Sequence, residues 1–101
     1  MDNDTREVLI AVDNIVERLS GKLLPSDIRH GWSDESRTAM LRHYQRIRTR
    51  IAQGEKLLDK DGSVGRQLDA WGIDGGLLEN SLFGVSEMLR AQRSLFQSDS
   101  R

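Results

Sequence analysis

The residue types that could perform catalysis gather at one place in the chain. His30, Ser33 and Asp34 supply the imidazole, hydroxyl and carboxylate of a nucleophilic triad. A working triad takes its members from separate elements, so that each side chain can face the next. Ser33 followed by two acids is instead typical of a helix start, where a hydroxyl caps the first turn and carboxylates favour the positive end of the helix dipole. The sequence therefore predicts a helix cap here, no catalytic residues and no enzyme.

The acids and histidines show no spacing that a metal ion or cofactor requires. Asp59, Asp61 and Asp69 surround Gly62, but the glycine is misplaced for a calcium loop and Ala70 stands where that loop needs its closing glutamate. The two histidines have no neighbouring histidine or cysteine to complete a zinc site. No strand followed by a glycine-rich loop and a helix indicates a nucleotide fold. We expect neither a metal nor a cofactor.

A stripe of arginines is the most distinctive pattern in the chain. Five arginines and no acid lie between residues 36 and 54, and Arg42, Arg46 and Arg50 recur every four positions. We expect these three to be exposed, and Arg37 and Arg48 to be paired or to extend along the apolar seam. The exposed face can be solvated, can bind an acidic partner, or can pair with acids of neighbouring helices. The candidate acids are Asp13, Glu17, Glu79 and Glu87.

The charge balance favours a protein partner over nucleic acid. The chain has 15 Lys+Arg against 16 Asp+Glu, a formal net charge of −1, so the residues outside the stripe are acidic in sum. A nucleic-acid-binding domain usually carries surplus positive charge. We therefore expect a small interaction module, of adaptor, regulator or inhibitor type, that docks an acidic protein, with nucleic-acid phosphates as the alternative ligand. The predicted basic face comprises Arg42, His43, Arg46, Arg50 and Gln53.

Length and composition indicate one small domain. A chain of 101 residues, 37% of them hydrophobic, can build one modest core. The absence of cysteine suits a reducing compartment, and no apolar run reaches the length of a signal peptide or membrane span. We expect a cytoplasmic, soluble helical domain over residues 1–101 with a disordered tail at about 98–101 and no membrane partner.

Apolar periodicity predicts an all-α antiparallel bundle of three long helices and one short one. The first long helix spans about 5–23, with Asp4 and Glu7 in the pattern of a capping box. The second spans about 34–58, with Gly54 as a weak point where it can kink or end early. The core stripes of these two helices are Val8, Val12, Ile15, Leu19 and Leu23, then Met40, Tyr44, Ile47, Ile51 and Leu58.

The glycine-rich stretch after the second helix predicts the short helix, at about 63–71. Ser63 is its expected cap and Gly72 its expected end. Trp71 would then cover one end of the bundle.

The last long helix, predicted at about 76–97 with Asp74 near its cap, carries more than one apolar face. Its second face either packs beneath the other helices or forms a homodimer, in which Gly84 and Ala91 allow close approach of two helices. The core stripe is Leu78, Leu82, Val85, Leu89 and Phe96, and the candidate dimer or partner face is Leu77, Gly84, Met88, Ala91 and Leu95, with Phe83 on a further side.

Overall fold

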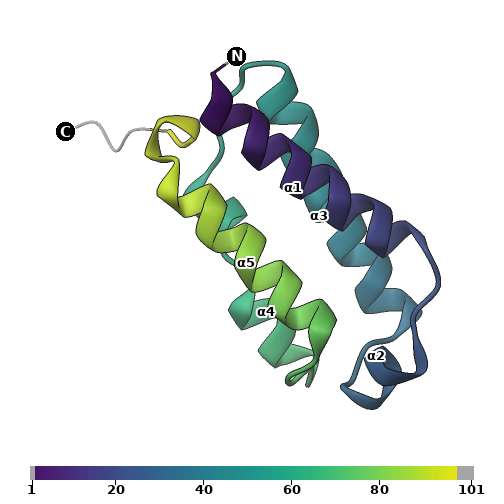
Figure 1. Cartoon of the computed structure of the whole chain (residues 1–101). Helices are drawn as coiled ribbons and strands as arrows, with labels where there is room; N and C mark the ends of the chain where they lie inside the picture. The colour runs from purple at the N-terminus through teal and green to yellow at the C-terminus, as the bar shows by residue number, and fades with distance from the viewer. Residues whose placement is uncertain (1, 98–101) are drawn as a thin grey trace.

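The structure, a computed structural model, describes residues 2–97, and this part of the chain is all-α, as predicted (Figure 1). It contains no strand; a single isolated bridge joins Leu57 and Phe96. The predicted disordered tail at 98–101 lies outside the described residues. The elements are α1 (Asn3–Ser20), α2 (Pro25–Arg29), α3 (Asp34–Ala52), the 3-10 helix η1 (Asp59–Gly62), α4 (Gly65–Ala70), α5 (Leu77–Ala91) and the 3-10 helix η2 (Arg93–Leu95).

Helix α1 packs against both α3 and α5 and runs antiparallel to each of them (Figure 1). Because α3 and α5 run in the same direction, the chain between them must return along the bundle, and η1 and α4 lie on that return. None of the helices in residues 2–97 has the length and apolar character that a membrane crossing needs. The three long helices bury Val8, Val12, Ile15, Leu19, Met40, Tyr44, Ile47, Ile51, Leu78, Leu82, Val85 and Leu89 in one core.

Helix α1 begins and ends earlier than predicted. The Asp2 carboxylate accepts the Thr5 N–H at 2.7 Å, so Asp2 and not Asp4 is the cap. At the other end Gly21 is extended (φ −84°, ψ −178°), and the helix stops at Ser20 instead of continuing to residue 23. Val8, Val12, Ile15 and Leu19 form the apolar stripe as predicted, whereas Leu23 lies beyond the helix and both predicted boundaries are wrong.

A short helix, α2, lies between the two predicted long helices, where no helix was predicted. Pro25 stands at its first position, where a missing N–H removes no helical hydrogen bond. The buried Asp27 side chain accepts the Leu24 N–H at 2.8 Å and the Arg18 guanidinium at 2.6 Å. The sequence did not predict this helix because five residues are too few to show a helical period. The contact with Arg18 cannot be predicted from a local pattern either.

The start of α3 is as predicted and its end is not. Ser33 Oγ accepts the Ser36 N–H at 3.2 Å, and Ser36 Oγ accepts the Ser33 N–H at 2.9 Å. The helix ends at Ala52 because Gly54 adopts a left-handed conformation (φ +75°). The sequence indicated Gly54 as a point where the helix could end early, and the helix does end before it. The predicted continuation to residue 58 is wrong.

The segment after α3 and the segment after α5 are joined by backbone hydrogen bonds. Neither segment continues its helix. Leu57 N–H donates to Leu95 O at 2.7 Å, and Gln97 N–H donates to Leu57 O at 2.8 Å. Helix α5 stops at Ala91, so its predicted extension to residue 97 is wrong. Phe96 is buried as expected, but it reaches the core from extended backbone after η2.

The predicted short helix is present as α4, with a different beginning. Val64 precedes it and no side chain caps it, so the predicted Ser63 cap is wrong. Gly72 closes it as predicted, with φ +75° and the Ile73 N–H bonded to Leu68 O at 3.0 Å. Trp71 at its end is only half-buried and packs against the side of the core.

Hydrogen bonds join the loop after α2 to the loop before α5. His30 Nδ1 lies 2.8 Å from Asp74 O, and Asp74 N–H donates to His30 O at 3.1 Å. Gly76, at φ +96°, precedes α5, and a Cβ there would lie 2.8 Å from the His30 ring. Asp74 therefore contacts the neighbouring loop through its backbone; it lies near the start of α5 as predicted, but Gly76 is the cap residue. His30 and Ser33 accordingly bond to different segments of the chain.

Candidate protein-interaction surfaces

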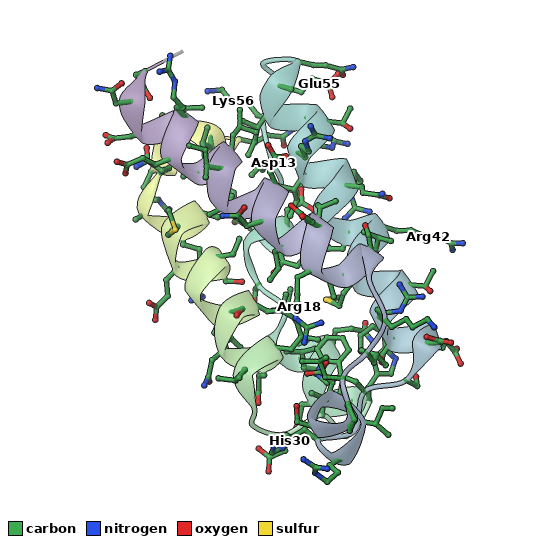
Figure 2. The ribbon with its side chains drawn as sticks, turned by 45° about the vertical axis from the view of Figure 1, so that its right-hand side comes forward. Asp13, Arg18, His30, Arg42, Glu55 and Lys56 are labelled. Carbon is green, nitrogen blue, oxygen red and sulfur yellow. The ribbon has the colours of Figure 1, made fainter. Side chains whose placement is uncertain are left out.

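Arg42 is the free member of the arginine stripe. Its side chain extends from α3 into solvent (Figure 2), and no acid among residues 2–97 forms an ion pair with it. Its exposure matches the prediction. An exposed guanidinium without an acidic partner has donors available to a carboxylate of another molecule.

Arg46 is exposed as predicted, but it has an internal partner. Its Nη2 lies 3.1 Å from Oδ1 of Asp61, and the two side chains are 51% and 1% exposed. Oδ2 of the same carboxylate accepts the Leu58 N–H at 2.9 Å. Asp61, the third residue of η1, therefore bonds the N–H of the residue before that helix and holds the return segment against α3.

His43 lies between these groups and contributes hydrogen bonds more than charge. Its Nε2 is 3.2 Å from Asp61 O, and Nη2 of Arg46 is 3.4 Å from Nδ1. A proton on Nε2 satisfies both contacts, because Asp61 O can only accept and the guanidinium can only donate. Burial, with help from the Arg46 charge, lowers the pKa of His43 below its usual 6.5. The ring is thus neutral near pH 7.

Arg50 is only half-exposed, so its predicted exposure is confirmed in part. Its Nη1 lies 3.9 Å from Glu55 Oε1 and donates to Lys56 O at 3.4 Å. Gln53 is exposed at the end of the helix, where its N–H donates to Thr49 O. These contacts order the turn after α3 and lie about one helical turn or more beyond Arg46.

The two remaining arginines of the stripe are paired, as predicted. Arg37 Nη1 donates to Leu19 O at 2.7 Å and its Nε lies 3.3 Å from Asp34 Oδ1. Arg48 forms an ion pair with Asp13 on α1, one of the acids proposed as an internal partner. The stripe is therefore partly neutralised by the protein itself.

A small hollow borders Arg46, and its charged lining is basic. It has a volume of about 200 Å³ and lies between α3 and the segment 60–67. Lys60 was not among the predicted site residues. Its position next to α3 depends on the path of the turn between them, which no local sequence pattern predicts. The lining residues are Met40, His43, Arg46, Lys60, Ser63, Val64 and Gln67.

The second apolar face of α5 remains uncovered within the chain. Leu77 is 78% exposed and Met88 37% exposed, and Gly84 and Ala91 are also exposed. Helix α1 covers only the adjacent flank, so the alternative in which the other helices bury both flanks does not hold in residues 2–97. Leu95 differs from these four because it belongs to η2 and packs against the core.

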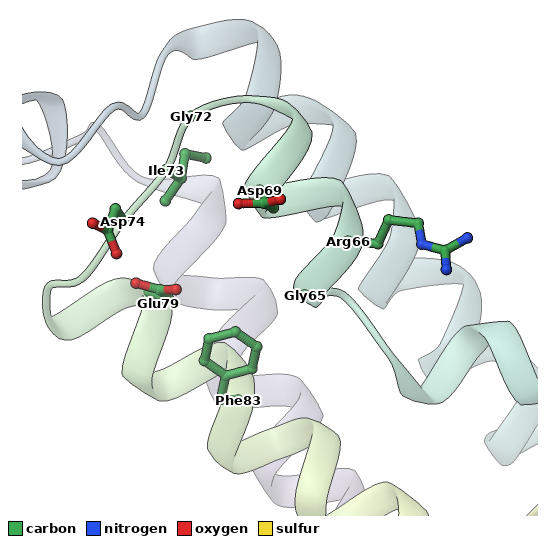
Figure 3. A pocket seen from close by; sticks show the side chains of 8 residues that line it. All are labelled: Gly65, Arg66, Asp69, Gly72, Ile73, Asp74, Glu79 and Phe83. Carbon is green, nitrogen blue, oxygen red and sulfur yellow. The ribbon is translucent and has the colours of Figure 1, made fainter.

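Phe83 faces a separate hollow between α4 and α5. Asp69 and Glu79 lie on facing sides of this hollow, which has a volume of about 640 Å³, and Arg66 points away from it (Figure 3). Glu79 also accepts the Gly75 N–H. Phe83 therefore does not share a surface with Leu77.

The acids and histidines of residues 2–97 form no group of three that could hold a metal ion. No family model, curated protein or solved structure matches the chain. The functional argument therefore rests on the surfaces described above.

Proposed function

We propose that the chain is a small helical protein-interaction module that docks an acidic segment of a partner protein on the outer surface of α3. The observation that carries the proposal is Arg42, an exposed cation with no acidic partner among the described residues, on a chain of net charge −1. The cytoplasm is the proposed compartment, on the basis of composition alone.

The neighbouring hollow supports this assignment. Arg46 uses one face of its guanidinium on Asp61 and stays half-exposed, and Lys60 adds a second exposed cation. Arg42, Arg46 and Lys60 thus supply more positive charge than the buried Asp61 carboxylate can neutralise. Exposed charges of this kind contribute orientation and speed of association more than affinity. The partner segment should therefore carry two or more acids.

Internal pairing makes nucleic acid the weaker alternative. Arg46, Arg48 and Arg50 each face a carboxylate of the chain itself. Phosphate binding relies on several cations that can each neutralise one phosphate. Because most arginines of this face already pair with acids of the chain, the face offers fewer phosphate contacts than the sequence indicated.

Affinity capture from an extract of the source cells, with and without nuclease, tests the proposal. The full chain should retain a protein whose contact region is acidic, and nuclease should not release it. Arg42→Glu should abolish capture while circular dichroism shows unchanged helix content. The folded state should survive because substitutions of unpaired surface residues usually change stability by about 0.5 kcal/mol or less.

Arg6→Glu on α1 is the matched control, since it makes the same charge change at another exposed arginine. It should leave capture unchanged. Equal loss with both variants would indicate a net-charge effect and would refute a docking site at Arg42. Release by nuclease would assign the surface to nucleic acid instead.

A further inference from the structure

Helix α5 contains a glycine that the fold of one chain does not require. Gly84 lies in the helix interior, where glycine is less favourable than alanine by about 1 kcal/mol. A Cβ at this position would meet no atom within 4 Å, and the backbone there is not left-handed. Neither packing nor backbone geometry within residues 2–97 therefore explains the missing side chain. A close approach by another backbone is one role for which glycine is suited.

The glycine is central to an exposed seam, defined here as Leu77, Ser81, Gly84, Met88 and Ala91. Leu77, Gly84 and Ala91 are spaced seven residues apart, which is the repeat of helices that pack at a shallow angle. All five residues are exposed. Leu77 also borders, with Leu24, a groove between α1 and α5, so the apolar surface continues beyond the seam. Leu77 and Met88 are the exposed large apolar side chains of the seam, and exposed apolar surface is typical of protein contacts.

The seam is complementary to itself when two copies are antiparallel. A two-fold axis at Gly84 places the large Leu77 opposite the small Ala91 of the second copy. It also places Met88 opposite Asn80 and Ser81, and the two glycines face each other. Large side chains thus meet small ones along the whole seam, as close packing of two helices requires.

The charges agree with the same arrangement. Glu87 is the charged residue nearest the seam on its open side, and the two-fold axis places it beside Asn80 and Ser81 of the second copy. The two Glu87 residues are then about 9 Å apart along the helix axes, from a rise of 1.5 Å per residue. The two-fold axis therefore keeps the Glu87 carboxylates of the two copies apart.

We propose that the chain forms a two-fold homodimer in which α5 packs antiparallel against α5 of a second copy, centred on Gly84. An interface of this type is isologous and closes at two subunits. Helices α5 and α3 lie on opposite sides of α1 (Figure 1), so the dimer leaves Arg42 of both copies exposed. The inference is thus independent of the proposed docking site on α3.

Introduced cysteines test the register, because the chain has no cysteine of its own. Gly84→Cys should form a covalent dimer under mild oxidation, since residues on the two-fold axis are the closest pair and a disulfide needs Cα atoms within about 7 Å. Ile10→Cys is the control: it is 53% exposed on α1 but lies away from the seam. It should remain monomeric on a non-reducing gel over the same period.

Sedimentation equilibrium of the unmodified chain provides the second measurement. At about 100 µM it should give twice the chain mass of 11.5 kDa. Met88→Glu should reduce the mass to one chain with unchanged helix content, whereas Ile10→Glu should not. Arg42→Glu should also leave the dimer intact, which separates failure of this inference from failure of the docking proposal.

Either of two results would overturn the dimer. One is a mass of 11.5 kDa for the unmodified chain at this concentration. The other is cross-linking of Gly84→Cys no faster than that of Ile10→Cys. Loss of the dimer on Ile10→Glu but not on Met88→Glu would assign association to α1 and equally refute the α5 seam.

Discussion

Arg46 Nη2 and Asp61 Oδ1 lie 3.1 Å apart, and they join the middle of α3 to η1. The contact joins a cation of the arginine stripe to an acid that was not among the internal partners predicted from the sequence. Because the carboxylate is almost fully buried and the guanidinium is half-exposed, the two partners are not equivalent. Removal of the cation leaves a buried charge, whereas removal of the acid leaves a cation that water can solvate.

We expect Arg46→Ala to lower the free energy of unfolding by about 2–4 kcal/mol, because it leaves the Asp61 carboxylate buried and unpaired. Urea unfolding followed by circular dichroism measures the effect. Arg42→Ala, one turn away and unpaired, is the control and should change stability by about 0.5 kcal/mol or less. The double variant Arg46→Ala/Asp61→Asn should be more stable than Arg46→Ala alone. Equal effects of the two single alanine variants would show that the ion pair is not part of the folded state.

Two left-handed glycines, Gly76 before α5 and Gly54 after α3, should differ in their sensitivity to substitution. Gly76→Ala should destabilise the chain by more than about 2 kcal/mol, because a Cβ would strain the backbone and would lie 2.8 Å from His30. Gly54→Ala meets no atom within 4 Å, so only the conformational strain of about 1–2 kcal/mol remains. Thermal unfolding of the two variants compares them directly. A larger loss for Gly54→Ala would contradict the packing of His30 on Gly76.

His43 should make stability depend on pH in the weakly acidic range. Burial lowers the pKa of His43 below the usual 6.5, so the unfolded chain takes up its proton at a higher pH than the folded one. The stability due to this residue is therefore complete above 6.5 and is lost as pH falls toward the lower, folded-state pKa. Urea unfolding at about pH 7.5 and pH 5.5 should show this loss, and His43→Gln should reduce it.

If His43→Gln and the unmodified chain lose the same stability between the two pH values, the neutral buried imidazole is not present.

The sole tyrosine offers a measurement in alkaline solution. Burial raises the pKa of Tyr44 to about 12, and the neighbouring Ser86 hydroxyl opposes part of that rise. Phenolate absorbance should appear near pH 12 in the folded chain and near 10 in urea. The stability due to the neutral phenol is then present below 10 and decreases as pH rises toward 12. Native phenolate at pH 10 would mean that Tyr44 is accessible to water.

The sequence predicted those parts of the fold that depend on neighbours along the chain. The apolar stripes of α1, α3 and α5 follow from the helical period, and the ends at Gly54 and Gly72 follow from the left-handed backbone that glycine permits. The Ser33 cap is equally local. The predictions fail where a contact with a distant residue helps to set the local structure. One example is α2, where the Arg18 guanidinium contacts Asp27.

The candidate surfaces divide in the same way. The sequence by itself determined which residues could form a basic face on α3 and an apolar face on α5, because each face repeats within one helix. Only the tertiary structure decided which arginines remained free: Asp61 came from a return segment whose path no local pattern encodes. It also decided that Leu57 pairs with the C-terminal segment and that the α5 seam stays uncovered, because both depend on which distant segments meet.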